Sequence, residues 1–467
     1  MTKKKIFILL PDGLGLRNFG YSDFYQNSLT ENNEIIFWNI TSFPLAEMGY
    51  KELKIENSKI HPLTDIYKNA KVQVVLNLNI KKSNDKVYNE YRFPFSYKNY
   101  KNLIKNILIQ LLTLTHSSEK GLFRIRKKII ENETKTLYYS QCLETLQIEK
   151  PSIVFCTNQR HITTVAPLLA AKALDIPTAS LIFSWDNLPK ATMVVETDYY
   201  FVWSNFMKEE LLFYYPYIKP VQIVVTGSPQ FELHFDSDKL LSRNTFFQRY
   251  GLDFNKKYIC YSGDDFTSSP DDEKYLEDLA IAVEKLNQKN YNIGIIFRRC
   301  PVDFSSRYDA VLEKYSDCIT IVNPLWKPLT SIWNAVLPTK DDDTLLSSIA
   351  EHSEMVVNLG SSTVFDFVAH KKPCGYFNYN QHFQLNPKWD IFKCYQFVHF
   401  RSMPTKDSVF WINNPEEIAE TIEKMLSDDS EKVIKNAQLW FEKINQHPPE
   451  LASERIWDAI AKIIDKD

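Results

Sequence analysis

The chain has 467 residues and a net charge of −3, with 44% hydrophobic and 24% charged residues. This composition excludes wholesale disorder. It also excludes the strongly basic character of a dedicated nucleic-acid binder, so no nucleic acid is expected among the partners. The length predicts two or three domains, and the absence of any run of 18 apolar residues predicts no membrane span.

Short apolar strands alternate with helical patterns in the first half of the chain. The expected strands are 6–10, 34–40, 72–76, 153–156, 179–183, 199–203 and 222–225. Apolar residues repeat at helical spacing over 103–112, and an alanine-rich helix is expected over 165–174. Apolar strands joined through helices predict a parallel sheet that is covered on both faces.

The same alternation resumes after a polar stretch, 236–257. The expected strands are 258–261, 293–297, 319–322, 355–358 and 374–379, and the expected helices are 271–286, 344–352, 364–370, 431–446 and 448–465. The fold class is therefore α/β, with two Rossmann-like, doubly wound domains. We place an N-terminal domain at 1–240, a C-terminal domain at 241–430 and closing helices at 431–467.

Ligands of open parallel sheets bind outside the carboxyl ends of the strands. The first strand runs into Asp12-Gly13-Leu14-Gly15-Leu16-Arg17-Asn18. Two glycines in three residues permit a tight turn and a close approach of a ligand, and the helix that follows offers N–H groups to an anion. A βα turn without a ligand is the alternative. His161 follows the strand 153–156 and is the histidine best placed for acid–base chemistry, although a lone histidine is often structural.

Three strand ends of the second half carry candidate residues. Ser262-Gly263 ends the first strand, and its small side chains would let a ligand approach. Arg298-Arg299 ends another strand, where two buried arginines are costly unless they face an anion or a carboxylate; a structural salt bridge is the alternative. Gly360-Ser361-Ser362-Thr363 opens a helix, where hydroxyl groups can cap the helix or donate to a phosphate. Asp366, one turn further, is suited to accept hydrogen bonds from a ribose.

Acidic residues and cysteines give no metal signal. The acidic pairs at 264–265 and 271–272 and the triplet 341–343 lie beside predicted helix starts, so N-capping and the helix dipole favour a structural role over metal binding. Seven widely spaced cysteines include no CxxC pair, which predicts a reducing cytoplasm, no disulfides and no zinc site. The basic N-terminus is followed by only five apolar residues, too few for a signal-peptide core.

These motifs resemble the GT-B glycosyltransferases, which use nucleotide sugars. Within them, the second half is similar to the glycerophosphotransferase and surface-polysaccharide transferase branch. That branch shows Arg-x-His-Pro where this chain has Arg298-Arg299-Cys300-Pro301, and a Ser-Ser helix start followed by an acidic residue, often Glu, where Asp366 stands here. In the first half, Asp12 to Phe19 and Ser184-Trp185-Asp186-Asn187 resemble motifs of surface-carbohydrate biosynthesis proteins, and Thr226-Gly227-Ser228-Pro229 resembles their strand end before the interdomain linker.

The resemblance implies two domains facing a cleft, with the closing helices crossing back to the first domain. It implies transfer of a sugar to a glycan or lipid-linked acceptor, without a metal and with the nucleotide-diphosphate sugar as co-substrate in place of a cofactor. The donor would contact Ser262, Gly263, Arg298, Arg299, Gly360, Ser361, Ser362, Thr363 and Asp366. The acceptor would contact Gly13, Gly15, Arg17, Asn18 and Asn187, with Asp12 as the first candidate for the general base and Asp186 and His161 behind it.

Three other functions stay open. They are transfer of a polyol phosphate from a CDP-linked donor, epimerisation of a sugar nucleotide at C2 without hydrolysis, and a scaffold without activity.

Four cations are mixed with apolar residues in 121–130, beside the apolar-faced helix 103–114. For a cytoplasmic protein, this pattern is compatible with contact between 103–130 and the inner face of the cell membrane. A partly solvated helix packed on the sheet is the alternative.

Overall fold

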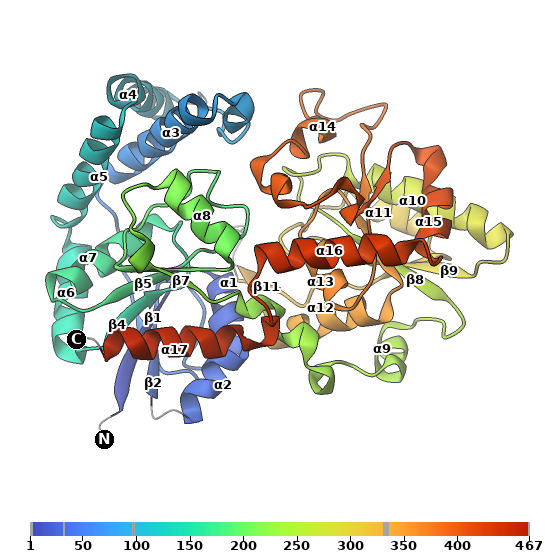
Figure 1. The fold of residues 1–467 in the computed structure, drawn as a ribbon, viewed down its shortest axis with the longest axis horizontal. Helices are drawn as coiled ribbons and strands as arrows, with labels where there is room; N and C mark the ends of the chain where they lie inside the picture. The colour runs from blue at the N-terminus through green and yellow to red at the C-terminus, as the bar shows by residue number, and fades with distance from the viewer. Residues whose placement is uncertain (1–2, 31–32, 96, 98, 330–335, 466–467) are drawn as a thin grey trace. The chain divides into compact units, whose positions relative to one another are not determined.

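The computed structural model describes residues 3–30, 33–95, 97, 99–329 and 336–465. The chain forms two compact units (Figure 1). Unit 1 comprises Met1–Pro229 and Ile444–Asp467, and unit 2 comprises Gln230–Lys443. The sequence-based boundaries at 240 and 430 thus differ by eleven and thirteen residues from those of the two units.

The sheet of unit 1 has seven parallel strands in the order β3-β2-β1-β4-β5-β6-β7. Its strands are β1 (Lys4–Leu10), β2 (Asn33–Asn39), β3 (Glu52–Lys54), β4 (Ile153–Cys156), β5 (Thr178–Leu181), β6 (Tyr199–Val202) and β7 (Ile223–Val225). The last five residues of β1 are fully buried, as expected of a central strand with helices on both faces.

Helices of unit 1 connect and cover these strands. They are α1 (Gly13–Leu16), α2 (Asp23–Thr30), α3 (Thr64–Ser83), α4 (Tyr100–His116), α5 (Glu119–Glu133), α6 (Leu137–Glu149), α7 (Val165–Ala173), α8 (Asn205–Tyr214) and α17 (Ala452–Ile464). The C-terminal helix α17 is anchored on α2, because the Trp457 ring stacks on Phe24 at 4.6 Å and its Nε1–H donates to the Phe24 carbonyl at 2.8 Å.

The strand predicted at 72–76 is wrong, because this segment lies in the middle of α3. Its valines favour a strand by propensity, yet no glycine or proline interrupts the twenty residues of the helix. Ala70 and Val74 are both buried and one helical turn apart, and α3 packs against α4 and α5. Tertiary packing of a helical face therefore overrides the local β-propensity.

The main sheet of unit 2 has six parallel strands in the order β10-β9-β8-β13-β14-β15. Its strands are β8 (Lys257–Ser262), β9 (Ile293–Arg298), β10 (Ile319–Ile321), β13 (Met355–Asn358), β14 (Cys374–Phe377) and β15 (Phe410–Ile412). A separate antiparallel pair, which the sequence does not predict, consists of β11 (Lys327–Pro328) and β12 (Val336–Leu337).

Eight helices of unit 2 are described. They are α9 (Arg243–Tyr250), α10 (Asp272–Gln288), α11 (Asp309–Lys314), α12 (Lys340–His352), α13 (Thr363–Ala369), α14 (Ile391–Cys394), α15 (Ile418–Met425) and α16 (Ser430–Ile444). The predicted start of α12 at 344 is wrong by four residues. The acidic triplet 341–343 therefore lies in the first turn of the helix, where Asp342 is buried.

Each sheet has one topological switch point, where consecutive connections leave a pair of neighbouring strands in opposite directions. The pair is β1 and β4 in unit 1, and β8 and β13 in unit 2. The loops at the carboxyl ends of such a pair diverge and leave a crevice, which is where open α/β sheets bind ligands. The topology thus marks one candidate position in each unit.

Lys71 of α3 is buried, with 3% of its surface exposed, and lines a cavity of 80 Å³ with Arg126 and Glu196. Burial lowers the pKa of Lys71 to about 8, against the attraction of Glu196. Since the usual lysine pKa is 10.5, keeping the Lys71 amine charged in the folded protein lowers the free energy of unfolding by on the order of 3 kcal/mol at pH 7. This cost disappears as the pH rises from about 8 to 10.5, because the unfolded chain then also loses the proton.

Replacing Lys71 with methionine is therefore expected to raise the free energy of unfolding at pH 7 by up to about 3 kcal/mol. The gain over the parent protein should shrink between pH 8 and pH 10.5. Urea unfolding across this pH range measures it, with Lys81→Met on the exposed side of the same helix as the control. If the gain in the free energy of unfolding does not change with pH, the removal of a buried charge is not its cause.

Candidate functional site

Asp12 lies directly after β1 and forms the centre of the unit 1 site. It caps α1, with its Oδ1 accepting from the backbone N–H of Gly15 at 2.8 Å. Its Oδ2 accepts from Asn158 Nδ2 at 2.6 Å and lies 3.2 Å from His161 Nε2. Two of the predicted catalytic residues, which are 149 positions apart, are therefore in direct contact.

The pairing of β1 with β4 brings these residues together. Leu9 and Cys156 are register partners, so the loops that follow the two strands emerge side by side. Glycine is required at position 15, because a Cβ there would overlap the Thr157 side chain. Gly15 therefore serves the packing of the turn against β4, which is a structural role beside the predicted contact with an acceptor.

Asp12 is ionised at neutral pH. Burial alone would raise the pKa of Asp12, but the hydrogen bond and charge interaction with His161 and the donors Gly15 and Asn158 lower it below its usual value. A carboxylate that contacts and orients an imidazole in this way is typical of catalytic acid–base pairs.

A second set of contacts joins the loop after β5 to the loop after β4. Gln159 is fully buried, donates through Nε2 to Asn187 Oδ1 at 3.2 Å and accepts from the Phe183 N–H at 2.8 Å. Asn187 in turn donates to Asp186 Oδ1 at 2.8 Å, and Asp186 also pairs with Lys190. Asn158 and Gln159 carried no predicted role; the signal that could have found them is their polarity directly after a buried strand.

The other predicted acceptor contacts follow Asp12 along the chain. Gly13 opens α1, and Arg17 and Asn18 lie in the π-helical turn Arg17–Tyr21. Asn18 is 5% exposed, and its Oδ1 is buried with no hydrogen-bond partner among the described residues.

In unit 2, Ser262 and Gly263 lie at the carboxyl end of β8. The Gly263 N–H donates to the Arg298 carbonyl at 2.9 Å, which extends the pairing of β8 with β9. A Cβ at Gly263 would stand 3.0 Å from the Tyr308 hydroxyl. The small residue thus accommodates Tyr308, whose hydroxyl donates to Asp272 at 2.7 Å.

Arg298 forms a buried salt bridge with Asp342 of α12. Its Nη2 donates to both carboxylate oxygens, at 3.0 and 2.9 Å, and both side chains are under 10% exposed. Asp342 also accepts from the Leu325 N–H at 2.8 Å and from Trp326 Nε1 at 2.6 Å. Arg298 thus forms the structural salt bridge that was the alternative to anion binding, while its Nη1 stays buried without a partner among the described residues.

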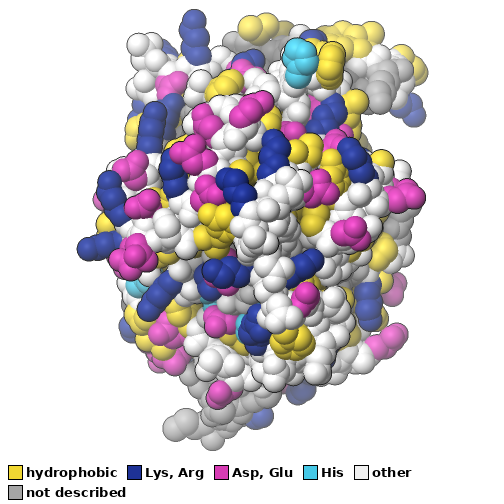
Figure 2. Space-filling view, turned by 90° about the vertical axis from the view of Figure 1, so that its right-hand side faces the viewer, with side chains coloured by type: hydrophobic (Ala, Val, Ile, Leu, Met, Phe, Trp, Pro, Cys, Tyr) yellow, Lys and Arg dark blue, Asp and Glu magenta, His cyan; other side chains and the backbone are white. Residues whose placement is uncertain are grey.

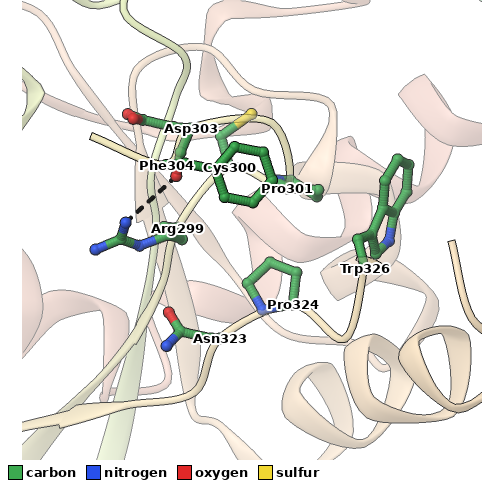
Figure 3. Close-up of a pocket in the computed structure, with 8 residues that line it drawn as sticks. All are labelled: Arg299, Cys300, Pro301, Asp303, Phe304, Asn323, Pro324 and Trp326. Atoms are coloured by element: carbon green, nitrogen blue, oxygen red, sulfur yellow. Dashed lines mark hydrogen bonds between the residues drawn. The ribbon is translucent and has the colours of Figure 1, made fainter. Parts of the chain in front are cut away.

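A pocket of 310 Å³ lies beside Arg299, at the carboxyl ends of β9 and β10. Figure 3 shows Arg299 and Asn323 on one side of it and Trp326 on the opposite side, with Phe304 and Pro324 between them. Arg299 Nη1 donates to the carbonyls of Asp303 and Ser305, at 3.3 and 3.2 Å. Flat apolar groups with polar groups at one edge suit a heteroaromatic ligand.

Cys300 lines the same pocket, at the position where the resembling branch has histidine. Burial raises the pKa of the Cys300 thiol to about 12. The side chain is therefore protonated and uncharged at neutral pH, so it supplies neither the positive charge of an imidazolium nor a nucleophile.

The loop after β13 begins α13, a helix of seven residues. Asn358 Oδ1 accepts from the Ser361 N–H at 2.9 Å, and Ser361 Oγ accepts from the Thr363 N–H at 3.4 Å. Ser362 is exposed and makes no capping bond. Gly360 has a φ of +73°, a left-handed conformation that favours glycine, and Tyr395 and Phe400 pack against it.

Asp366 ends a chain of contacts through two histidines. Its Oδ1 lies 3.0 Å from His234 Nε2, His234 Nδ1 lies 3.0 Å from His370 Nε2, and His370 Nδ1 lies 2.7 Å from Glu351. Burial and the neighbouring His234 lower the pKa of His370 to about 4, so His370 is neutral at neutral pH.

Asp264, just beyond β8, is an acidic group that the sequence assigned only to a helix start. Burial, and then repulsion from Asp272 and Asp265, raise the pKa of Asp264 well above its usual value. Asp265 instead accepts from the Thr267 and Ser268 N–H groups and closes a turn. The unit 2 site therefore carries a carboxyl group biased towards its protonated form.

Among residues 3–30, 33–95, 97, 99–329 and 336–465, no group of three or more His, Cys, Asp or Glu side chains could hold a metal ion. No helix in this described part of the chain is long and apolar enough to cross a membrane.

Several solved structures share the fold of this chain. A glycosyltransferase from Rickettsia africae ESF-5 is 13% identical, with both chains fully covered and a TM-score of 0.53. The UDP-GlcNAc 2-epimerase from Neisseria meningitidis bound to UDP-GlcNAc is 10% identical over 99% of this chain and 100% of its own, with a TM-score of 0.52. S. aureus MnaA with UDP is 13% identical over 99% and 97%, also at 0.52.

These similarities, together with the two parallel sheets, show that the chain has the GT-B fold, which confirms the fold expected from the sequence. No protein-family model matches the sequence, and a comparison with curated proteins gives no match.

Proposed function

We propose that this protein is a nucleotide-sugar-dependent glycosyltransferase that moves a sugar to a hydroxyl of a glycan or lipid-linked acceptor, as in bacterial surface-carbohydrate biosynthesis. The observation that carries the proposal is the contact between Asp12 and His161 at the switch point of unit 1. Transfer to a hydroxyl needs a proton acceptor, and this pair is suited to that task.

In the proposed reaction the acceptor oxygen forms a bond to the anomeric carbon, and the bond from that carbon to the diphosphate breaks. The hydroxyl proton goes to the Asp12–His161 pair, and the nucleoside diphosphate leaves with the bonding electrons. Asp12 stays the first candidate for the base, with His161 as its partner. Asp186 is a weaker candidate because its carboxylate is already held by Lys190 and Asn187.

Unit 2 is proposed to bind the donor. The pocket beside Arg299 would take the nucleotide base between Phe304 and Trp326, and the diphosphate would lie near Ser362 at the start of α13. Since Asp342 balances the charge of Arg298, we expect Arg299 to neutralise more of the leaving group's charge.

Phe304→Ala is expected to weaken UDP binding about five-fold or more, because stacking on an aromatic ring contributes about 1–3 kcal/mol per base. Phe304 is 57% exposed, so the substitution should leave the fold intact. Isothermal calorimetry measures the affinity. Phe254→Ala is the control, since this exposed phenylalanine lies just before the amino end of β8, whereas the pocket lies at carboxyl ends of strands. If the Phe304→Ala variant and the parent protein bind UDP with equal affinity, the nucleotide base does not bind in this pocket.

A second candidate is epimerisation of the sugar nucleotide. The Asp12–His161 pair offers both a proton acceptor and a proton donor, which such a reaction also needs. Incubation with a sugar nucleotide and no acceptor separates the two activities, since only an epimerase gives isomerised substrate. A thermal-shift panel of UDP, GDP, CDP and CMP tests the third candidate, because transfer of a polyol phosphate would show a preference for cytidine nucleotides.

A further inference from the structure

The helix α4 has an inverted distribution of side chains. A surface helix normally turns its apolar face to the core and its polar face to water. On α4, six large aliphatic side chains are instead 38–80% exposed: Leu103, Ile104, Ile107, Leu108, Leu111 and Leu114. They recur at spacings of three and four residues and so form one outward stripe.

The opposite face of α4 carries the polar contacts with the rest of unit 1. Lys105 pairs with Asp65 of α3, and Asn106 is buried together with Ile109. The helix packs on this face against α3 and α5. The outward stripe is therefore not a core face exposed by chance, because the helix already has its packing partners on the other side.

The neighbouring helix α5 adds positive charge. Lys120, Arg124 and Lys127 are exposed on one face, together with Phe123, which is 62% exposed. From 100 to 133 the chain has seven Lys or Arg residues and three acidic residues, whereas the whole chain has a net charge of −3. Lys127 and Lys128 both lie within 4 Å of Glu131, and the exposed Lys120 and Arg124 add further positive charge to α5. By contrast, the face drawn in Figure 2, which is on the right in Figure 1, has basic and acidic side chains interspersed and hydrophobic ones in small groups.

We propose that the stripe on α4, with the basic face of α5, docks on the surface of a membrane that contains anionic lipids. The aliphatic side chains would enter the boundary between headgroups and acyl chains, while the cations contact lipid phosphates. An anionic bilayer fits both features, whereas a protein partner would have to combine an apolar groove with an acidic rim. The docking proposal does not depend on the reaction catalysed; under the proposed function, it would bring the enzyme to lipid-linked acceptors.

Co-sedimentation with vesicles tests this proposal, with no nucleotide present, so its outcome does not depend on the proposed reaction. The full chain is expected to bind vesicles of phosphatidylcholine with phosphatidylglycerol, and to bind pure phosphatidylcholine less. Binding should weaken between about 0.1 M and 1 M salt, because the Debye length falls from about 10 Å to 3 Å. Absence of binding to the anionic vesicles at low salt would overturn the proposal.

Variants distinguish the two parts of the surface. Ile107→Asp with Leu111→Asp should lower the vesicle partition coefficient at least about ten-fold, since it places charge at the apolar boundary. Neutralising Arg124 and Lys127 should lower it about five-fold for each cation on anionic vesicles alone. Val221→Asp, on a side chain that is 75% exposed elsewhere in unit 1, is the control and should bind normally. Unchanged binding of the Ile107/Leu111 variant would overturn the proposal.

Light scattering tests the main competing occupant, a second copy of this chain. The parent protein and the Ile107/Leu111 variant are expected to have the same mass without vesicles. A parent dimer that becomes a monomer in this variant would assign the stripe to contact between copies and overturn the membrane proposal.

Discussion

Asp342→Asn is expected to lower the free energy of unfolding of unit 2 by about 3 kcal/mol or more, because it leaves the buried Arg298 without a counter-charge. Asparagine keeps the size of the side chain and an oxygen that can accept from the Leu325 N–H. The loss therefore reports the charge more than the packing. Hydrogen exchange in denaturant measures it, with amides of β9 reporting on unit 2 and amides of β1 on unit 1.

Asp341→Asn is the matched control for this prediction. Asp341 lies in the same turn of α12 but is exposed, so its loss should cost less than about 1 kcal/mol. Replacing Arg298 with methionine together with Asp342→Asn should recover part of the stability, since no buried charge is then left unpaired and the asparagine can still accept from the Leu325 N–H. Equal stabilities of the two single variants would show that the Arg298–Asp342 pair does not stabilise unit 2.

Asp12→Asn is expected to reduce turnover by about 10² to 10⁴-fold, the usual contribution of a general base. The amide oxygen can still accept from the Gly15 N–H, so the cap of α1 and the fold should survive. Nucleotide affinity should stay within two-fold of the parent value, as roughly expected for a residue outside unit 2. Steady-state rates with a nucleotide sugar and acceptor, and calorimetry with the nucleotide alone, separate the two effects.

Asp85→Asn is the control for this substitution, because Asp85 also caps a short helical turn, through the Val87 N–H at 2.9 Å. His161→Gln should slow turnover as well, since it removes the imidazole partner of Asp12. Full activity of the Asp12→Asn variant would exclude Asp12 as the base and leave the proton to another group.

The partners of the predicted site residues could not be read from the sequence. Arg298 was expected to face the donor's phosphates, with a structural salt bridge as the alternative, and Asp342 was taken for part of a helix start. Asp366 was expected to face a ligand, yet it contacts His234, which is 132 positions away. Such contacts join distant segments, and nothing in the local pattern of either segment indicates its partner.

Periodicity alone determined the α/β class, because buried parallel strands and amphipathic helices differ in the spacing of their apolar residues. It also located the loops after β1, β4, β8, β9 and β13, since these directly follow apolar runs. Strand order was decided only by tertiary structure: it sets β1 beside β4, and so Asp12 beside His161. Tertiary packing likewise made 72–76 helical and turned the aliphatic face of α4 outward. Both depend on which surfaces the neighbouring helices cover, and the sequence of a single segment does not specify which helices pack against it.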